Sequence, residues 1–241
     1  GKVSTSDVVT INGVGTYADK NVTASANKSY TVTNLSLSGA DAANYVLTNG
    51  STSAAISTQN GSNGQITPRT LNVSYTGVDR VYDGGTLATV TTADDRVAGD
   101  ALTIARTAAF ANKNVAYDLS SNVISKAVSV SGVSLSGTDA ANYSVSSTGS
   151  ASADITKKTL SAALVGSIQK TYDGTTDATL AAGNYSLSGF VTVSGVTEGA
   201  TVTQTAGTYN SRNVLDANSV TTTLASGDFT ANSGTSLSNY T

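Results

Sequence analysis

The sequence predicts an all-β protein made of tandem small antiparallel β-sandwich modules, Ig-like in type, that are stacked end to end. Three observations lead to this prediction. Ser, Thr, Gly and Asn surround a supply of Val, Leu, Ala and Ile, a composition that favours strands. Short runs alternate apolar and polar residues with the period of a strand. A Tyr-Asp-Gly motif occurs twice, at residues 80–86 and 170–176, so one structural unit is built more than once.

Each sandwich would hold about seven strands, with a bulge and one helical turn. A β-grasp-like module is the alternative, because the opening and closing strands of a module could pair in parallel. A right-handed β-helix is less favoured, since its coils are much shorter than the repeat found here.

Two Ile-Thr-x-x-Thr-Leu seams, at residues 66–71 and 155–160, mark where one module ends and the next begins. They divide the chain into the C-terminal part of a module at residues 1–67, a complete module at 68–156, and a module at 157–241 that lacks its closing strand. Two residues separate the closing and opening strands at each seam, too few for a flexible tether. We therefore expect restricted hinge motion and a monomeric rod.

Composition excludes several kinds of chemistry. With no His and no Cys, the chain lacks the usual neutral-pH base, a thiolate nucleophile and disulfides. The net charge of -3 and the 12% of charged residues argue against a nucleic-acid surface, which needs clustered Lys and Arg. Acids paired for glycoside hydrolysis do not recur in every module. We expect no enzyme activity, no catalytic residues and no cofactor.

Membrane insertion is not expected either. No apolar run is long enough to span a bilayer. Gly1 does not begin a signal peptide, so we expect a fragment of a longer protein.

The Tyr-Asp-Gly motif is best explained as a tight backbone corner. Gly permits positive φ, Asp accepts a hydrogen bond from the backbone that follows it, and Tyr buries its ring while its hydroxyl reaches a partner. The corner residues are Tyr82, Asp83 and Gly84 in the second module and Tyr172, Asp173 and Gly174 in the third. The alternative makes Tyr82 and Tyr172 ligand-binding residues, stacking platforms for sugars.

A second repeated stretch places Asp41 and Asp139 before a short helical turn that leads into Tyr45 and Tyr143. We expect each carboxylate to accept hydrogen bonds from the free N–H groups of its turn, and each Tyr ring to fill the core. Calcium binding is the alternative, but one acid per loop gives too few ligands. The third module has its counterpart at residues 237–240, without an Asp.

An aromatic residue, a polar turn, a cation, Asn and Val recur in that order in all three modules, at residues 17–22, 110–115 and 209–214. This pattern indicates an aromatic core residue followed by a turn that Asn assists.

The apolar alternation slips by one position within the long strands of the first and second modules. A slip would turn every later side chain to the wrong face unless one residue bulges out. The sequence therefore predicts β-bulges at residues 33–34 and 131–132.

Three acids, Asp94, Asp95 and Asp100, lie in one loop of the second module and are weak calcium candidates. The third module has Glu198 but no acid pair in its corresponding loop. We therefore interpret the loop as solvated and predict no metal site.

Together these motifs resemble the YDG-type repeat domains of filamentous-haemagglutinin-like bacterial surface adhesins, which are exported by two-partner secretion. The stretches that carry the resemblance are residues 135–143, 170–176, 184–190 and 208–214. The resemblance spans nearly the whole chain. It implies a secreted protein at the bacterial cell surface, associated with the outer membrane, and a role in cell adhesion or biofilm formation.

The expected function is therefore a non-catalytic extracellular stalk or spacer. The alternative is a carbohydrate- or matrix-binding repeat, whose partner would be an extracellular polysaccharide or a host or matrix surface. It requires exposed Tyr or Asp clusters at the same place in successive modules. A self-made Lys-to-Asn isopeptide cross-link would suit a stalk, but no Lys, Asn and acid triple recurs in the sequence.

Overall fold

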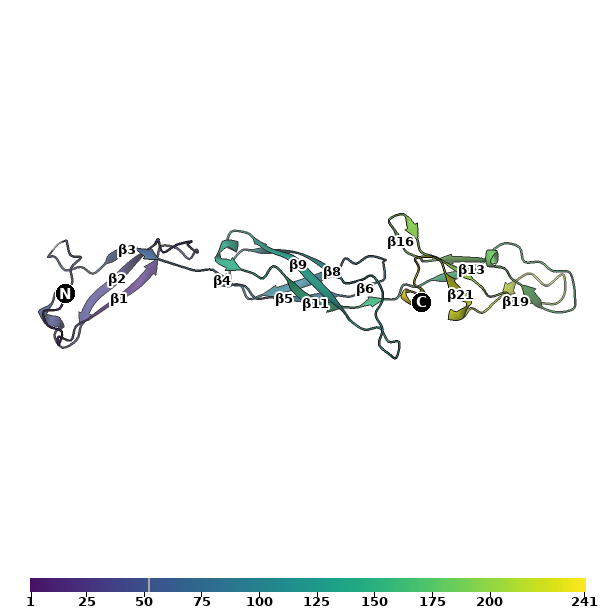
Figure 1. The fold of residues 1–241 in the computed structure, drawn as a ribbon, viewed down its shortest axis with the longest axis horizontal. Coiled ribbons are helices and arrows are strands. Elements are labelled where there is room, and N and C mark those ends of the chain that lie inside the picture. The colour runs from purple at the N-terminus through teal and green to yellow at the C-terminus, as the bar shows by residue number, and fades with distance from the viewer. Residues whose placement is uncertain (52) are drawn as a thin grey trace. The chain divides into compact units, whose positions relative to one another are not determined.

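The structure is a computed structural model that describes residues 1–51 and 53–241, and it is almost entirely β (Figure 1). The all-β prediction is confirmed. The described helical segments are 3-10 turns: η1 Ala42–Asn44, η2 Ala140–Asn142, η3 Ala182–Asn184, η4 Ser226–Asp228 and η5 Leu237–Asn239. Across the described ranges, no helix has both the length and the apolar character needed to cross a membrane.

The first module contains one antiparallel sheet in the order β1-β2-β3. Its strands are β1 Thr10–Tyr17, β2 Lys28–Ser38 and β3 Gln59–Gly64. The two strands β1 and β2 run from the pair Thr10 and Ser38 to the pair Tyr17 and Tyr30. The rings of this last pair meet edge to face, with centroids 6.3 Å apart.

The second module contains most of the buried apolar side chains. Its strands are β4 Arg69–Thr70, β5 Val73–Val78, β6 Arg80–Val81, β7 Thr89–Asp94, β8 Thr103–Phe110, β9 Lys126–Ser136, β10 Tyr143–Ser144, β11 Gly149–Ala153 and β12 Ile155–Thr156. They form a three-stranded sheet in the order β11-β9-β8 and two-stranded pairs, including β5-β7. The core side chains include Leu71, Val90, Ile104, Phe110, Val128, Val130 and Ile155.

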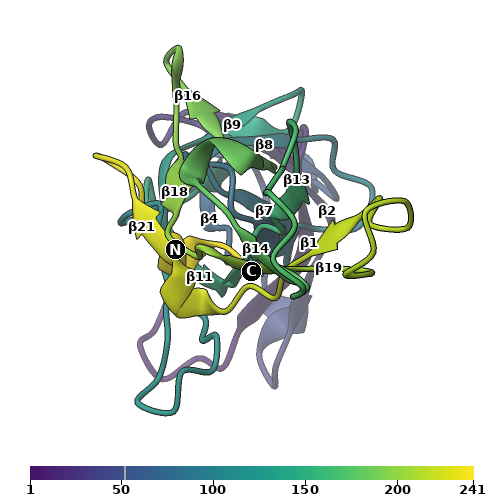
Figure 2. The ribbon, with the colours of Figure 1, turned by 90° about the vertical axis from the view of Figure 1, so that its right-hand side faces the viewer.

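The third module is made of short antiparallel pairs. Its strands are β13 Ser161–Leu164, β14 Asp177–Thr179, β15 Tyr185–Ser188, β16 Thr192–Val193, β17 Val196–Thr197, β18 Ala200–Val202, β19 Ala206–Tyr209, β20 Val220–Thr221 and β21 Phe229–Ala231. The hairpin of β16 and β17 turns through Ser194 and Gly195, both at positive φ. Figure 1 and Figure 2 both show this hairpin extending away from the other strands of its module.

The second module contains two parallel strand pairs, each between a segment near its beginning and one near its end. Strand β4 pairs with β10, and β6 pairs with β12, with Ile155 opposite Arg80. The β-grasp-like alternative depended on a parallel pair of opening and closing strands, whereas the closing strand β12 pairs here with β6, and the opening strand β5 pairs with β7. The sheets themselves hold two or three strands each.

Both predicted bulges are present. In the first module one residue of β1 lies opposite two residues of β2, and Asn34 has a φ of 55°. In the second module Gly132 has a φ of 62° at the matching position. Beyond each bulge the next N–H bonds across the sheet, from Leu35 to Ser57 and from Val133 to Ser147. The extra residue therefore keeps Val128, Val130 and Val133 in the core.

The chain divides into two compact units that do not coincide with the modules. One unit holds Gly1–Val73, Asp94–Ala105 and Val133–Ser147, and the other holds Ser74–Ala93, Arg106–Gly132 and Thr148–Thr241. The first unit thus joins the first module to part of the second, and the other unit joins the rest of the second module to the third. Each unit contains one place where consecutive modules meet.

Candidate functional site

The repeated motifs meet at two junctions between modules. In the first unit, the loop at residues 19–22 lies against the second module, and in the other unit the loop at residues 112–115 lies against the third. We call these two loops and their counterpart at residues 211–214 the junction loops. The surface that receives a junction loop is the junction socket. Its residues are Asp100, Asp139, Asn142 and Tyr143 in the second module, Glu198, Asn239 and Tyr240 in the third, and Asp7, Asp41, Asn44 and Tyr45 in the first.

Each junction loop is shaped by a local hydrogen bond. The side chain at its first position accepts from the backbone N–H two residues later. The bonds run from Asn21 to Asp19 at 2.8 Å, from Asn114 to Asn112 at 3.1 Å and from Asn213 to Ser211 at 3.1 Å. A turn was predicted here, but the residue that assists it is the Asp, Asn or Ser at the first position. At the two junctions the later Asn, Asn21 or Asn114, is bonded by the neighbouring module, whereas Asn213 donates to Asp216 of its own module at 3.3 Å.

A lysine from the next strand fixes the first two loops at their base. The Nζ of Lys28 donates to Asp19 Oδ1 at 2.6 Å and to the Asn21 carbonyl at 2.7 Å. Lys126 donates in the same way to Asn112 Oδ1 at 2.8 Å and to the Asn114 carbonyl at 2.5 Å, and also to the Asn112 carbonyl at 2.8 Å. These bonds to charged donors hold each loop in shape before it meets a neighbour.

The cation of each loop pairs with acids of the socket. Lys20 Nζ lies 2.5 Å from Asp100 Oδ1 and 2.8 Å from Asp139 Oδ1. At the second junction, Lys113 Nζ lies 2.6 Å from Glu198 Oε1. The carboxylates are largely shielded from solvent, so these pairs are less screened than ordinary surface pairs.

One asparagine in each socket binds both the backbone and the side chain of the loop. Its Oδ1 accepts from a loop N–H, and its Nδ2 donates to the side chain of the loop Asn. At the first junction Asn142 accepts from Val22 at 2.9 Å and donates to Asn21 at 3.2 Å. At the second, Asn239 accepts from Val115 at 2.9 Å and donates to Asn114 at 3.0 Å. The two junctions are therefore built to one geometry.

The tyrosine after that asparagine orders the acid of the socket. Its hydroxyl donates to the carboxylate and accepts from a backbone N–H of the same module. The donor bonds are Tyr143 to Asp100 and Tyr240 to Glu198, both at 2.6 Å, and the accepted bonds come from Val97 at 2.9 Å and Val191 at 3.2 Å. The prediction that Tyr143 fills the core is confirmed, because its side chain is buried.

Tyr82 of the Tyr-Asp-Gly motif belongs to the second junction. Its hydroxyl donates to Glu198 Oε1 at 2.7 Å, and its ring meets that of Tyr240 edge to face at 5.4 Å. Only 1% of Tyr82 is exposed, so its ring is not accessible to a sugar. The prediction of a buried tyrosine with a bonded hydroxyl is confirmed for Tyr82 and wrong for Tyr172, which is 64% exposed.

The corner itself forms as predicted in both modules. Gly84 and Gly174 each have a φ of 78°. The carboxylate of Asp83 accepts from the Gly85 N–H at 2.8 Å, and that of Asp173 accepts from the Thr175 N–H at 2.9 Å. Both bonds bridge a single intervening residue, which is the Asx turn expected for this sequence.

A cation two residues before the tyrosine completes the corner, and the sequence interpretation missed it. Arg80 Nη1 lies 2.5 Å from Asp83 Oδ2, and Lys170 Nζ lies 2.8 Å from Asp173 Oδ1. The hydrogen bond from Lys170, followed by those from Thr175, lowers the pKa of Asp173 to about 2. The signal was present in the sequence as a cation three residues before each Asp.

The predicted capping role of Asp41 and Asp139 is wrong. The turns η1 and η2 form, but neither Asp makes a side-chain bond to its own turn. Asp41 instead accepts from the Val8 N–H at 2.8 Å, and Asp139 accepts from the Ala101 N–H at 2.9 Å. The carboxylates reach a distant segment because that segment presents an N–H that would otherwise lack a partner.

The three acids of the loop in the second module point to separate partners. Asp94 pairs with Arg96 at 2.6 Å, Asp95 accepts from the side chain of Asn72 at 2.8 Å, and Asp100 belongs to the first junction. Among residues 1–51 and 53–241, no three acidic side chains gather as metal ligands would. The interpretation as a solvated loop is wrong for Asp94 and Asp100, whose side chains are each 9% exposed.

The junction contacts keep the socket carboxylates ionised. Hydrogen bonds from Lys20, then from Tyr143, lower the pKa of Asp100. Burial raises the pKa of Glu198, but the hydrogen bonds from Lys113, Tyr240 and Tyr82 outweigh it and the net shift is downward. The same contact with Glu198 raises the pKa of the Lys113 ammonium. Both partners are therefore charged at neutral pH.

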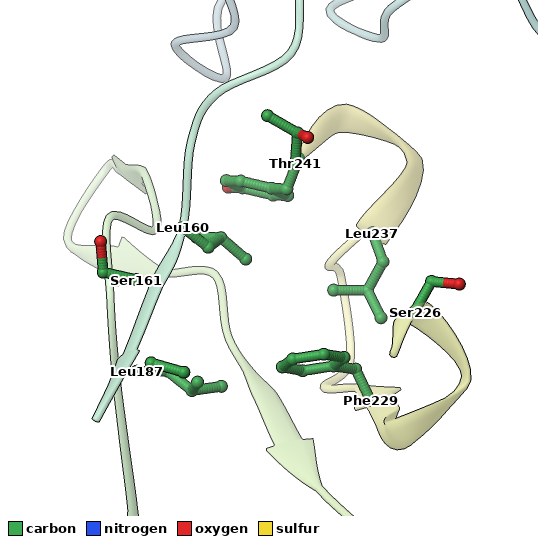
Figure 3. Close-up of a pocket in the computed structure, with 9 residues that line it drawn as sticks. Leu160, Ser161, Leu187, Ser226, Phe229, Leu237 and Thr241 are labelled. Atoms are coloured by element: carbon green, nitrogen blue, oxygen red, sulfur yellow. The ribbon is translucent and has the colours of Figure 1, made fainter. Parts of the chain in front are cut away.

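An apolar pocket of about 200 Å³ lies in the third module, next to the second junction (Figure 3). Leu187 and Phe229 point toward one another across it, with Leu160 and Leu237 on its sides. Tyr240 borders this pocket, and its hydroxyl already donates to Glu198. The pocket offers apolar contact and no acid–base pair.

The family model of the YDG domain matches the chain in three segments, residues 1–55, 67–151 and 156–241. No curated protein and no solved structure matches the chain. Each matched segment contains one junction loop and one junction socket, so the parts described above recur with the domain.

Proposed function

Because the chain belongs to the YDG-domain family, we propose that it is a non-catalytic stalk or spacer segment of a large bacterial adhesin, serving surface attachment or biofilm formation. One observation carries the proposal: the same junction is built twice, from the same positions of the domain. A repeat whose best-formed polar site binds its own neighbour is suited to spacing and to holding orientation.

Each junction resists bending by several means at once. The short seam limits the reach of the chain, the Lys-to-carboxylate pairs oppose separation, and the asparagine amides oppose rotation. Hydrogen bonds made by a side-chain amide require both partners in one orientation, since the donor and the acceptor lie on the same planar group. Neighbouring modules then act as a stiff pair.

The proposed module is the small antiparallel sandwich, and the proposed location is the exterior of the cell. The likeness of the motifs to repeats of filamentous-haemagglutinin-like adhesins supports export by two-partner secretion. Antibodies raised against the chain should label intact cells of the source organism. Labelling only after the cells are broken would contradict the location.

Small-angle scattering tests the spacer role. The chain is compared with a Lys20→Ser/Lys113→Ser variant, which removes the cation from both junctions. We expect one well-defined maximum dimension for the unaltered chain and a broad distribution for the variant. All profiles are recorded at a concentration at which the chain is monomeric. Arg212→Ser is the matched control, because it removes the corresponding cation from the third loop and leaves both junctions within the chain intact. A freely jointed profile for the unaltered chain would refute the spacer.

The alternative, a carbohydrate- or matrix-binding repeat, is favoured by one observation. Tyr172 is exposed beside an open pocket of about 380 Å³ that Lys170 and Arg212 also line. Against it, the corresponding Tyr82 and the repeated Tyr143 are buried. A glycan array distinguishes the two roles: a specific signal that Tyr172→Ala abolishes would establish binding, and a signal that is absent or unchanged by Tyr172→Ala would leave the spacer.

A further inference from the structure

The first module presents a junction socket with the same internal geometry as the two engaged sockets. The Tyr45 hydroxyl donates to Asp7 and accepts from the Val3 N–H at 2.7 Å. Tyr143 and Tyr240 make the corresponding pair of bonds. The Val8 N–H is bonded to Asp41 as the Ala101 N–H is bonded to Asp139. The socket is therefore formed without a loop against it.

The asparagine side chain that would bind an incoming loop, that of Asn44, is also in place. Asn44 follows Asp41 by one 3-10 turn, and its N–H donates to the Asp41 carbonyl at 3.1 Å. Asn142 occupies the same position after Asp139, at 3.0 Å. Asn44 is exposed, whereas Asn239 at the second junction is fully buried.

The third module presents the complementary surface. Its junction loop has the same local turn as the two engaged loops, held by Ser211. The side chains that a neighbour covers at the second junction are open here. Val115 is 6% exposed at that junction, and its counterpart Val214 is 72% exposed. The exposed fraction of the motif tyrosine rises in the same direction, from 1% for Tyr82 to 64% for Tyr172. Gly84 lies against Val193, whereas Gly174 has open space around it.

We propose that the junction socket of the first module binds the junction loop of another YDG module, head to tail, and that the third-module loop of a second copy of this chain can supply that loop. The occupant is fixed by the two junctions within the chain, which supply every contact. Arg212 would take the place of Lys20 between Asp7 and Asp41, and Asn44 would bind the N–H of Val214. The surfaces carry opposite charge, and the contact is heterologous, so it propagates instead of closing as a pair.

Two residue substitutions distinguish the third loop from the engaged loops, and both keep the groups that the contact needs. Arg replaces Lys at position 212, and a guanidinium can donate to two carboxylates at once. The socket of the first module has two acids, as at the first junction, where Lys20 bridges Asp100 and Asp139. Ser replaces Asp or Asn at position 211, and its hydroxyl still accepts the loop N–H.

Site-directed cross-linking tests the contact, because the chain contains no cysteine of its own. At the second junction Val115 bonds to Asn239, and the Tyr117 hydroxyl donates to the Ser238 carbonyl. On the socket side the counterpart of Ser238 is the exposed Ala43, and on the loop side the exposed Leu215 directly follows Val214, the counterpart of Val115. Purified A43C and L215C chains are mixed with a bismaleimide, and covalent heterodimer is measured against time.

We expect heterodimer to form at least about 10-fold faster than in a control mixture of T89C and L215C, because docking raises the effective concentration of the two thiols. Thr89 is exposed on strand β7 and lies outside both junctions. Adding Arg212→Glu to the L215C chain should reduce the rate to that of the control, whereas Arg212→Lys should preserve it. Equal rates for the A43C and T89C mixtures would overturn the proposal, as would a rate that Arg212→Glu leaves unchanged.

Discussion

At the scale of single residues, the decisive group is the asparagine that precedes each socket tyrosine. An amide carries an acceptor and a donor on one rigid plane, so Asn142 and Asn239 each satisfy a loop N–H and a loop side chain together. The repeated Asn is visible in the sequence. Its partner is not, because Asn142 lies 120 residues from Val22 and periodicity carries no information at that range.

Asn239→Ala should weaken the second junction by about 1–3 kcal/mol, because the buried Val115 N–H loses its acceptor. The measurement is hydrogen exchange at the Val115 amide, which should become faster in the variant. Asn44→Ala is the matched control and should change stability by less than about 0.5 kcal/mol, since Asn44 is exposed. Unchanged protection of Val115 would contradict the role given to Asn239.

Tyr82→Phe should cost about 1.5–3 kcal/mol, because a buried hydrogen bond to the Glu198 carboxylate is lost. Tyr172→Phe, at the same position of the motif, should stay within about 0.5 kcal/mol because Tyr172 is exposed. Urea midpoints of the two variants provide the comparison. Equal effects would show that burial of Tyr82 does not contribute to stability.

At the scale of elements, local patterns were predicted well and long-range side-chain partners were not. Bulges and Tyr-Asp-Gly corners follow from the slip in alternation and from the φ that Gly permits, both of which are properties of a few adjacent residues. The capping prediction was wrong because the Asp41 carboxylate accepts a hydrogen bond from the N–H of Val8, 33 residues away. A carboxylate near a turn has several possible donors, and only the fold decides among them.

The two glycine corners offer a matched test. Ala at Gly84 or Gly174 incurs about 1–2 kcal/mol of backbone strain, because both have a φ of 78°. A Cβ on Gly84 would also lie 2.4 Å from Val193 of the third module, which adds about 1–3 kcal/mol, whereas Gly174 has no atom within 4 Å of such a Cβ. Gly84→Ala should therefore lower the thermal midpoint more than Gly174→Ala. A reversed order would rule out the contact with Val193.

At the scale of the whole molecule, the chain is a series of modules coupled to their neighbours through charged junctions. The repeat, the seams and the all-β class could be predicted from self-similarity and alternation. The division into two compact units could not, because it depends on junction contacts that are as much a part of each unit as the sheets are. Stability in such a chain is a sum of module terms and interface terms.

Acid should uncouple the junctions. The pKa values of Asp100, Asp139 and Glu198 are all lowered. The hydrogen bond from Lys20 is the main cause for Asp100 and Asp139. Burial raises the pKa of Glu198, but its hydrogen bonds outweigh the burial. The stabilisation from these three carboxylates is thus complete above the usual carboxyl pKa values of 3.8 and 4.5 and is lost as the pH falls through the lowered values.

The stabilisation that Lys113 contributes is lost only at a much higher pH. The pKa of Lys113 is raised above its usual 10.5, so its contribution is complete below that value and is lost only as the pH rises through the raised one. Small-angle scattering at pH 7 and about pH 2 should show a gain in flexibility on acidification, because the socket carboxylates must be protonated below their usual pKa values before the junctions are lost. Glu198→Gln should show a smaller change between the two conditions, because its second junction has no carboxylate left to protonate. Identical profiles of the unaltered chain at both pH values would contradict this account.

The parallel pairing of β12 with β6 has a consequence for a protein under tension. Strand β12 ends the second module, and β6 is its third strand, so a pull on the two ends of the module draws these parallel strands along one another. The hydrogen bonds between Ile155–Thr156 and Arg80–Val81 are then strained together. The hydrogen bonds of an antiparallel hairpin pulled from its two ends would instead break one after another. The second module should therefore yield at a higher force than its short sheets suggest, and it should yield abruptly.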